Sequence, residues 1–171
     1  EIGFAGALQF MRSDGGVATP RATRENPAHM LTSGLAGGVT AAVKLCRDLR
    51  LDAVVTLDVG GTSADLAAIT GGQSRSRMSR VIDGQPVRLP TIDVETISNG
   101  GGSIAWVDPG GALKVGPLSA GAVPGPAWYG QGGTQPTVTD AAVVLGWLAP
   151  EDYLGGEVTI PTLYIPTKAM T

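Results

Sequence analysis

One strand–loop–strand segment holds the residues best suited to phosphate chemistry. Its loop reads Asp58-Val59-Gly60-Gly61-Thr62-Ser63-Ala64-Asp65 and lies between two runs of β-forming residues. A phosphate group needs backbone N–H donors at close range, and glycine permits that approach because it has no side chain and adopts positive φ. We therefore expect Gly60 and Gly61 to bind phosphate through their main chain. The hydroxyl groups of Thr62 and Ser63 are expected to add further donors.

Two aspartates flank this loop and predict metal-assisted chemistry. Asp58 ends the first strand and is expected to bind Mg²⁺ directly or through water, because that ion keeps several waters and takes few carboxylates. Asp65 is expected to be a second acid that orients water or the metal ion. Phosphoryl transfer depends mostly on positioning and charge neutralisation, and a loop of this composition supplies both. Taken alone, the segment is also readable as a plain hairpin turn, since Asp-Gly turns are common. The helix expected directly before it favours the phosphate-binding alternative.

A second glycine-rich loop is expected to give a nucleotide further contacts with bare backbone. Its members are Gly100, Gly101, Gly102 and Ser103. The string also fits G-x-G-x-x-A, but a dinucleotide-binding motif is excluded because Trp106-Val107-Asp108-Pro109-Gly110 cannot continue as the required helix. The chain has no P-loop ending in Gly-Lys-Ser/Thr either.

The elements around the first loop can be predicted from periodicity. Apolar residues three and four apart predict a helix over Gly37–Arg50, and the stripe consists of Val39, Ala42, Val43, Cys46 and Leu49. The β-rich run Ala53–Leu57 predicts a buried strand, and Leu66–Thr70 predicts the strand after the loop. The helix thus leads directly into the strand–loop–strand segment.

The elements around the second loop are shorter. Ile104–Val107 and Ala112–Val115 predict a hairpin. A final helix is expected to be capped by Thr139 or Asp140, and the Gly- and Pro-rich stretch 116–136 predicts an irregular loop.

Composition excludes several classes of function. The 12 basic and 15 acidic residues form no basic face, so nucleic acid is not an expected partner. A single cysteine excludes an internal disulfide and a cysteine-based metal site, which fits a reducing cytoplasm. No apolar run is long enough to predict a membrane span. Because the chain starts at Glu1 rather than Met, we expect it to be an internal fragment of a longer polypeptide.

Six strings together resemble the hydantoinase A / 5-oxoprolinase family, in family order over roughly residues 8–156. They are Ser13-Asp14-Gly15-Gly16-Val17, Ser33-Gly34-Leu35-Ala36-Gly37-Gly38, Asp58–Asp65, Gly100–Asp108, Gly121-Ala122-Val123-Pro124-Gly125-Pro126-Ala127 and Pro136-Thr137-Val138-Thr139-Asp140-Ala141. The order of helix, strand, D-x-G-G-T loop and strand also resembles the second half of actin-like ATPases.

The resemblance implies a fold and an activity. The fold is α/β, with a ribonuclease H-like mixed sheet, flanking helices and irregular Gly/Pro-rich loops. Residues 1–156 would belong to the ATPase domain, and 157–171 would be a peripheral tail. The implied activity is ATP-dependent opening of a cyclic amide such as a hydantoin or 5-oxoproline, with ATP and Mg²⁺ as cofactors. The implied partner is a hydantoinase B-like subunit or domain.

Departures from the family pattern bear on substrate choice. Leu35 replaces the usual proline, Ser98-Asn99 an alanine-glycine pair, Trp128 a common cysteine and Gln131 a common arginine. Two alternatives therefore stay open. One is an acetone-carboxylase-like ATP-dependent carboxylase subunit, and the other is a degenerate module that packs against partners without catalysis.

Several other reactive side chains have a simpler structural explanation. His29, the only histidine, is expected at the surface or in packing. Cys46 lies on the apolar stripe and is expected in the core rather than as a nucleophile. Asp140 is most simply a helix cap, although the family pattern leaves a ligand role open. Asp93 and Glu95 share one face of a polar strand and are expected to face solvent.

Overall fold

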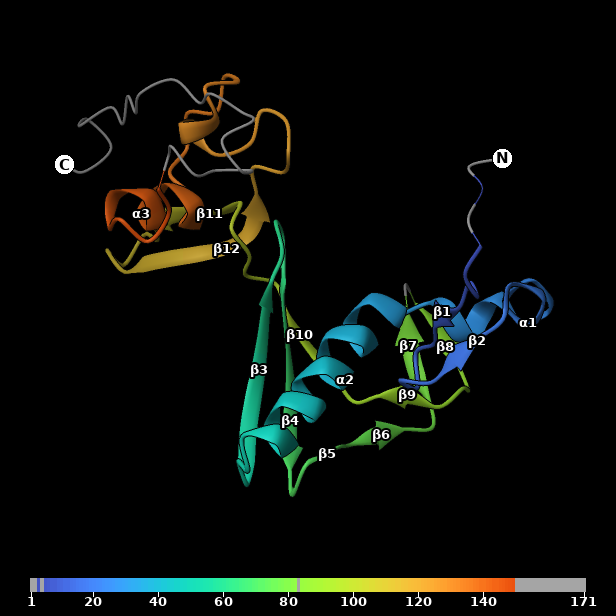
Figure 1. Ribbon diagram of the computed structural model, residues 1–171. Coiled ribbons are helices and arrows are strands. Elements are labelled where there is room, and N and C mark those ends of the chain that lie inside the picture. Colours follow the sequence, from blue (N-terminus) through green and yellow to red (C-terminus); the bar gives the residue numbers. More distant parts are fainter. Residues whose placement is uncertain (1–2, 4, 83, 150–171) are drawn as a thin grey trace. The chain divides into compact units, whose positions relative to one another are not determined.

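The computed structural model describes residues 3, 5–82 and 84–149, and it is a mixed α/β structure with several small sheets (Figure 1). It divides into two compact units. The first unit comprises the described residues up to 58 together with 65–95, and the second comprises 59–64 and the described residues from 96 onward. The expected tail 157–171 lies outside the described residues. Within the described ranges, every helix is too short or too polar to cross a membrane.

The first unit begins with a small hairpin and two short helices. β1 (Phe10–Met11) pairs antiparallel with β2 (Val17–Ala18). Helix α1 (Pro20–Glu25) follows, and its N-cap is Thr19, whose hydroxyl accepts a hydrogen bond from the amide of Ala22. The 3₁₀ helix η1 (Pro27–Met30) comes directly after it.

Helix α2 (Ser33–Asp48) provides the core of the first unit. The predicted stripe is confirmed in part, because Val39 and Cys46 are buried while Leu49 is exposed just beyond the end of the helix. The buried cluster joins the helix to residues of β4 and the segment 92–94, and its members are Ala36, Val39, Cys46, Ala67, Ile69, Ile92 and Val94. The helix begins at Ser33, the first residue of the string Ser33–Gly38, and its first turn already contributes Ala36 to this core.

The main sheet has the strand order β10-β4-β3, with β5 (Gln73–Ser74) also paired to β4. β3 (Ala53–Val59) and β4 (Ala64–Thr70) are the two strands predicted around the first loop, and β10 spans Glu95–Ile97. Helix α2 lies across one face of these strands (Figure 1).

The prediction that β3 is a buried strand is wrong. Its residues alternate between half-buried and exposed up to Leu57, and Val55 and Leu57 are 68% and 62% exposed. Val54, Thr56 and Asp58 share one face of the strand, and Val54 packs there against the core beneath α2. The other face has no covering layer among the described residues.

Two small ribbons complete the first unit. β6 (Ser76–Arg77) pairs antiparallel with β9 (Thr91–Ile92), and β7 (Arg80–Ile82) pairs antiparallel with β8 (Gln85–Val87).

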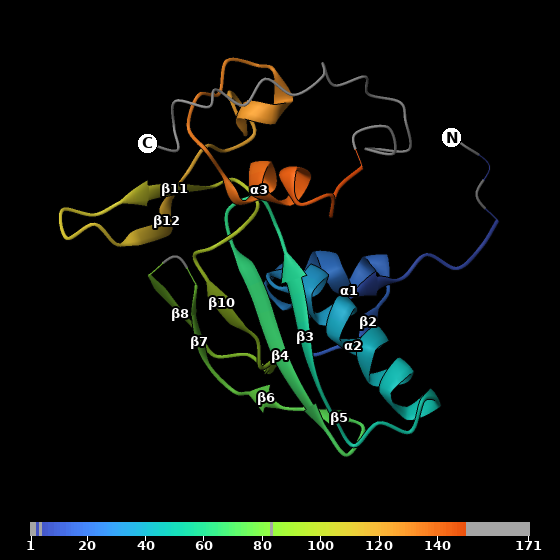
Figure 2. The same cartoon turned by 90° about the vertical axis from the view of Figure 1, so that its left-hand side faces the viewer.

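The second unit contains the predicted hairpin and the predicted final helix. β11 (Ser103–Val107) and β12 (Leu113–Ser119) form an antiparallel ribbon (Figure 2). The 3₁₀ helix η2 (Ala127–Tyr129) interrupts the irregular stretch, and α3 (Val138–Val144) follows. The cap of α3 is Thr137, not Thr139 or Asp140 as predicted, because Thr137 and Asp140 form a reciprocal capping box.

Candidate functional site

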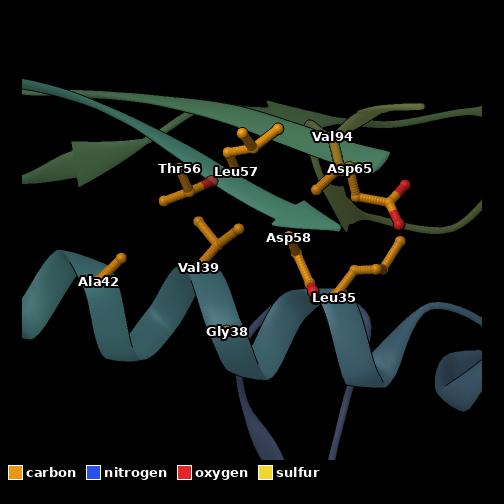
Figure 3. A pocket seen from close by; sticks show the side chains of 9 residues that line it. All are labelled: Leu35, Gly38, Val39, Ala42, Thr56, Leu57, Asp58, Asp65 and Val94. Atoms are coloured by element: carbon orange, nitrogen blue, oxygen red, sulfur yellow. The ribbon is translucent and has the colours of Figure 1, made fainter. Parts of the chain in front are cut away.

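The two aspartates predicted to carry metal chemistry line the same cavity of the first unit. This cavity, of about 350 Å³, lies between α2 and the strands β3 and β4. Figure 3 shows the side chains of Asp58 and Asp65 near the end of α2 that carries Leu35. Asp58 is exposed and Asp65 is half-buried. The rest of the wall is mostly apolar, with Val39, Ala42 and other small side chains.

The carboxylate pair is a sparse donor set. No group of three or more His, Cys, Asp or Glu side chains able to hold a metal ion occurs among the residues that the structure describes. Two carboxylates suit an ion that keeps most of its water, which is the behaviour of Mg²⁺. A dehydrated, all-protein cage of the kind that binds Ca²⁺ needs more oxygen ligands than this pair supplies.

The two glycine-rich loops meet in the second unit. The amide of Gly101 donates to the carbonyl oxygen of Gly60 at 2.9 Å, and the amide of Gly102 donates to that of Gly61 at 2.6 Å. The first loop is closed by a 2.8 Å hydrogen bond from the amide of Gly60 to the carbonyl oxygen of Ser63. The structure thus brings together two segments that the sequence pattern identified separately.

Gly100 allows this close approach. A Cβ atom at this position would lie 2.6 Å from the nitrogen of Ser63 and 2.7 Å from the nitrogen of Thr62. Both distances are shorter than any real Cβ contact, so only glycine fits without a shift of the backbone. At this position glycine therefore serves the packing of one loop on the other.

Some backbone donors of the first loop remain available. The amides of Gly61, Thr62 and Ser63 donate no hydrogen bond to another described residue. Space around Gly61 is open, since a Cβ added there would meet nothing within 4 Å. Adjacent unpaired amides in a turn form the kind of concavity that binds anions.

A cavity of about 470 Å³ opens beside these loops within the second unit. Its backbone wall is built by Gly60, Gly61, Gly101 and Gly102, and its aromatic wall by Tyr129 and Trp147. Ser103, predicted as a ligand contact, is fully buried, and its hydroxyl accepts a 2.8 Å hydrogen bond from the amide of Gly100. It therefore holds the second loop in shape.

Helix α3 is fixed to η2 through Asp140 and to the second loop through the backbone of Thr139. This carboxylate is only 4% exposed and accepts hydrogen bonds from the amides of Trp128 and Thr137 at 2.7 and 2.8 Å. The amide of Thr139 donates to the carbonyl oxygen of Gly101 at 2.8 Å. The oxygens of Asp140 are thus occupied by structural donors.

Asp93 and Glu95, which share one face in the sequence pattern, both form ion pairs with Arg77. The hydrogen bond to Glu95 is the main reason that the pKa of the Arg77 guanidinium lies above its usual value. Both acids are therefore partners of one cation on β6.

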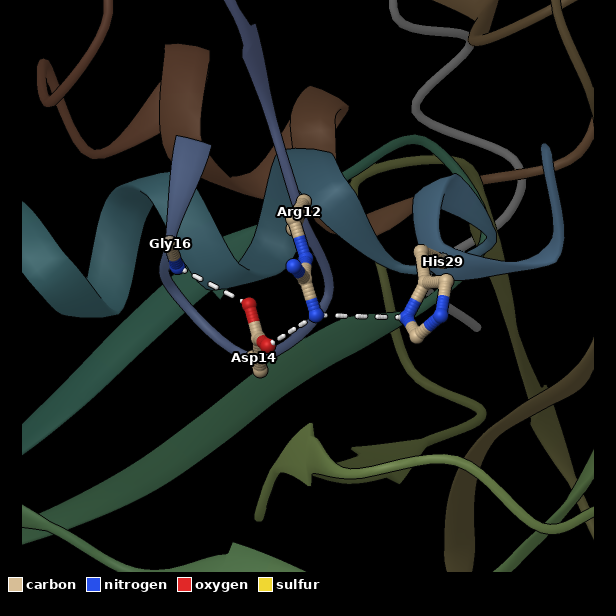
Figure 4. Close-up of polar contacts among 4 residues, drawn as sticks. All are labelled: Arg12, Asp14, Gly16 and His29. Carbon is tan, nitrogen blue, oxygen red and sulfur yellow. Dashed lines mark hydrogen bonds and ion pairs between the residues drawn. The ribbon is translucent and has the colours of Figure 1, made fainter. Parts of the chain in front are cut away.

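The sequence analysis missed one polar cluster in the first unit. Arg12, Asp14 and His29 interact around the turn after β1 (Figure 4). The string Ser13–Val17 was identified as part of the family resemblance, and nothing in its local pattern pointed to His29, which lies in η1.

Comparison with known proteins adds independent information. A family model described as Hydantoinase/oxoprolinase matches residues 1–164. Caprolactamase subunit alpha of Pseudomonas jessenii is 40% identical over 94% of this chain and 23% of its own length.

Two solved structures are also similar. The crystal structure of the ATP-dependent caprolactamase from Pseudomonas jessenii has a TM-score of 0.73 and 41% identity, over 89% of this chain and 22% of that one. The nucleotide-free structure of acetone carboxylase, described in terms of ATP-dependent acetone carboxylation, has a TM-score of 0.71 and 33% identity. The match covers 90% of this chain and 22% of the acetone carboxylase chain. The chain therefore spans less than a quarter of the length of these proteins.

Proposed function

Because the chain belongs to the hydantoinase/oxoprolinase family, we propose that it forms part of an ATP-dependent amidohydrolase that opens cyclic amide rings. The observation that carries the proposal is the meeting of the two glycine-rich loops beside an open cavity and beside amides that donate to no other described residue. Similarity to an enzyme described as an ATP-dependent caprolactamase supports both the nucleotide and the substrate class.

In this proposal the glycine loops bind the nucleotide. The amides of Gly61, Thr62 and Ser63 donate to phosphate oxygens, and the hydroxyl groups of the latter two add further donors. Gly60, Gly100, Gly101, Gly102 and Ser103 keep the two loops in register and shape the backbone wall. The aromatic wall of the same cavity has the flat, apolar character that suits a nucleobase.

Asp58 and Asp65 are proposed to carry the metal chemistry. Their carboxylates fit a hydrated Mg²⁺ ion, which would neutralise charge on the phosphates when bound. Asp58 is the proposed metal ligand, and Asp65 orients a water molecule.

The reaction begins when the carbonyl oxygen of the ring amide attacks the γ-phosphorus of ATP, which releases ADP. The ring carbon then carries a phosphate leaving group, so water adds to it more readily than to the amide. Collapse of the resulting tetrahedral adduct breaks the C–N bond, the nitrogen takes up a proton as it leaves, and an acyl phosphate remains on the open chain. A second water molecule then hydrolyses the acyl phosphate, which gives the carboxylate and inorganic phosphate. The chain's own role is positioning and charge neutralisation, which dominate phosphoryl transfer.

The wider context is also proposed. Residues 1–156 would form part of a ribonuclease H-like, actin-like ATPase domain, and a hydantoinase B-like subunit or domain would be the partner. The name caprolactamase subunit alpha supports an assembly of more than one chain.

The test is an Asp58→Asn variant in the complete polypeptide, assayed with 5-oxoproline, caprolactam and hydantoin. We expect ADP formation coupled to ring opening to fall at least about a hundredfold, the scale of losing one charge-stabilising group. Asp48→Asn, an exposed change in a helical ion pair, is the matched control. Turnover near the wild-type rate in the Asp58 variant would contradict the proposed role.

A carboxylase is the second candidate, because the similarity to acetone carboxylase extends over nearly the whole chain. ATP-dependent incorporation of labelled bicarbonate into acetone or acetophenone, without hydrolysis of any cyclic amide, would identify this branch. Absence of nucleotide binding to the complete polypeptide would instead favour a non-catalytic packing module.

A further inference from the structure

A small polar cavity lies in the first unit, among residues that the proposed function does not use. Its volume is about 110 Å³, and Arg12, Thr23, Asn26 and His29 line it together with Ala22 and Met30. These residues come from β1–β2, α1 and η1, which are consecutive in the chain.

The turn that carries Arg12 is held rigidly. The Arg12 amide donates to the carbonyl oxygen of Gly16 at 2.8 Å, and the amide of Ser13 donates to that of His29 at 2.7 Å. Ser13 is 2% exposed, and its hydroxyl accepts a 3.0 Å hydrogen bond from the amide of Thr32. The cavity wall is therefore preorganised by the backbone of two segments.

The side chain of Arg12 is fixed from one side only. Its Nη2 donates to Asp14 Oδ2 at 2.6 Å and lies 3.4 Å from His29 Nδ1 (Figure 4). Arginine can only donate, so this contact requires Nδ1 to be the acceptor and places the proton of a neutral ring on Nε2. The imidazole then offers a donor of its own.

Two buried polar atoms of the cavity residues have no partner among the described residues. They are Arg12 Nε and Thr23 Oγ1. A buried polar atom without a hydrogen bond costs free energy of folding. Such atoms therefore usually form a hydrogen bond with an ion, a water molecule or a ligand. Both residues line the same cavity, so a single ligand in that cavity would give both atoms a hydrogen-bond partner.

The chemistry of the wall selects the ligand. Arg12 Nε and the imidazole Nε2 donate, and the Thr23 hydroxyl and Asn26 amide are able to donate. Such a set matches acceptor oxygens. Asp14 offsets the charge of Arg12, which disfavours a multiply charged anion, and the volume admits only a small group.

We propose that this cavity binds a small planar oxyanion, either a carboxylate group or bicarbonate, through Arg12 Nε and the Thr23 hydroxyl. The proposal is independent of the nucleotide chemistry, because it rests on other residues.

The test uses nuclear magnetic resonance on the chain, whose single histidine gives one imidazole signal. Sodium acetate and sodium bicarbonate are titrated separately, with sodium chloride at equal ionic strength as the reference. We expect saturable shifts of the His29 ring and of the Asn26 side-chain amide with at least one oxyanion and not with chloride. Comparison of the two titrations shows whether the cavity prefers a carboxylate group or bicarbonate.

Two variants make the test specific. Thr23→Val should weaken binding about tenfold, the effect of losing one hydrogen bond to a charged group. It should leave the unfolding midpoint unchanged or raised, since the hydroxyl has no hydrogen-bond partner to lose among the described residues. Arg12→Lys keeps the charge beside Asp14 but removes Nε, and it should weaken binding by a similar factor. Arg21→Lys, in an exposed pair with Glu25, is the control.

Shifts that stay linear in concentration, or equal those with chloride, would overturn the proposal and leave a water molecule as the occupant. Undiminished affinity in Thr23→Val would also overturn it.

Discussion

The amide of Gly101 and the carbonyl oxygen of Gly60 are joined by a 2.9 Å hydrogen bond, although the two residues lie in different loops of the sequence. The neighbouring bond from Gly102 to Gly61 makes the connection a short two-rung ladder. The conformation of the first loop therefore depends on the second, and the two should respond together to substitution.

Gly100→Ala should destabilise the protein by about 1–3 kcal/mol, the usual cost of forcing an extra carbon into a packed site. The added Cβ would lie 2.5 Å from the carbonyl oxygen of Gly60, and backbone atoms cannot rotate away as a side chain does. Urea unfolding measures the change. A midpoint equal to that of the wild type would show that the two loops do not pack as described.

Gly61→Ala should separate binding from stability. Space at this residue is open, so the free energy of unfolding should change by no more than about 0.5 kcal/mol. If the amides of this loop bind phosphate, a methyl group there should weaken the affinity for Mg-ADP about tenfold by holding the ligand away. Calorimetric titration of the complete polypeptide measures this. Gly34→Ala, also in open space, is the matched control, and equal affinities in both variants would remove the loop from the proposed site.

Asp140→Asn should destabilise the second unit by about 1–3 kcal/mol. Both carboxylate oxygens accept hydrogen bonds, so the amide group of asparagine would place one donor against another. Thermal unfolding followed by tryptophan fluorescence is a suitable measurement, since the backbone amide of Trp128 donates a hydrogen bond to this carboxylate. An unchanged melting temperature combined with lost nucleotide binding would instead favour the ligand role that the family pattern leaves open.

Cys46 should be protected from thiol reagents in the folded state. It is 1% exposed, and its thiol donates to the carbonyl oxygen of Leu51 at 2.9 Å. Labelling by a chromogenic disulfide should therefore require local or global opening and should become fast in denaturant. Immediate stoichiometric labelling in native buffer would contradict the position of this residue in the core.

Local pattern was sufficient to predict the elements around the two loops. Helix α2 was found because Val39 and Cys46 recur with helical spacing, and that spacing reflects a real buried stripe. The hairpin β11–β12 was predicted because the β-forming runs Ile104–Val107 and Ala112–Val115 are separated by only four residues. Element ends were less accurate, as in α3, where Thr137 rather than Thr139 or Asp140 is the cap.

Contacts between distant segments were beyond the reach of local pattern. An apolar run such as Ala53–Leu57 indicates a strand, but it does not show which face of the strand packs against the core. Likewise, glycine at position 100 reads as a ligand contact until the backbone of Thr62 and Ser63 is seen beside it. The cluster of Arg12 and His29 was not predicted, because it depends on how the turn after β1 packs against η1.

The outward face of β3 has a consequence for handling the protein. The strand ends the order of its sheet, and Val55 and Leu57 stand exposed beside main-chain groups with no neighbouring strand among the described residues. Such an edge templates pairing with other polypeptides. Purified at high concentration, the chain should self-associate through this strand, and Val55→Lys should suppress that aggregation.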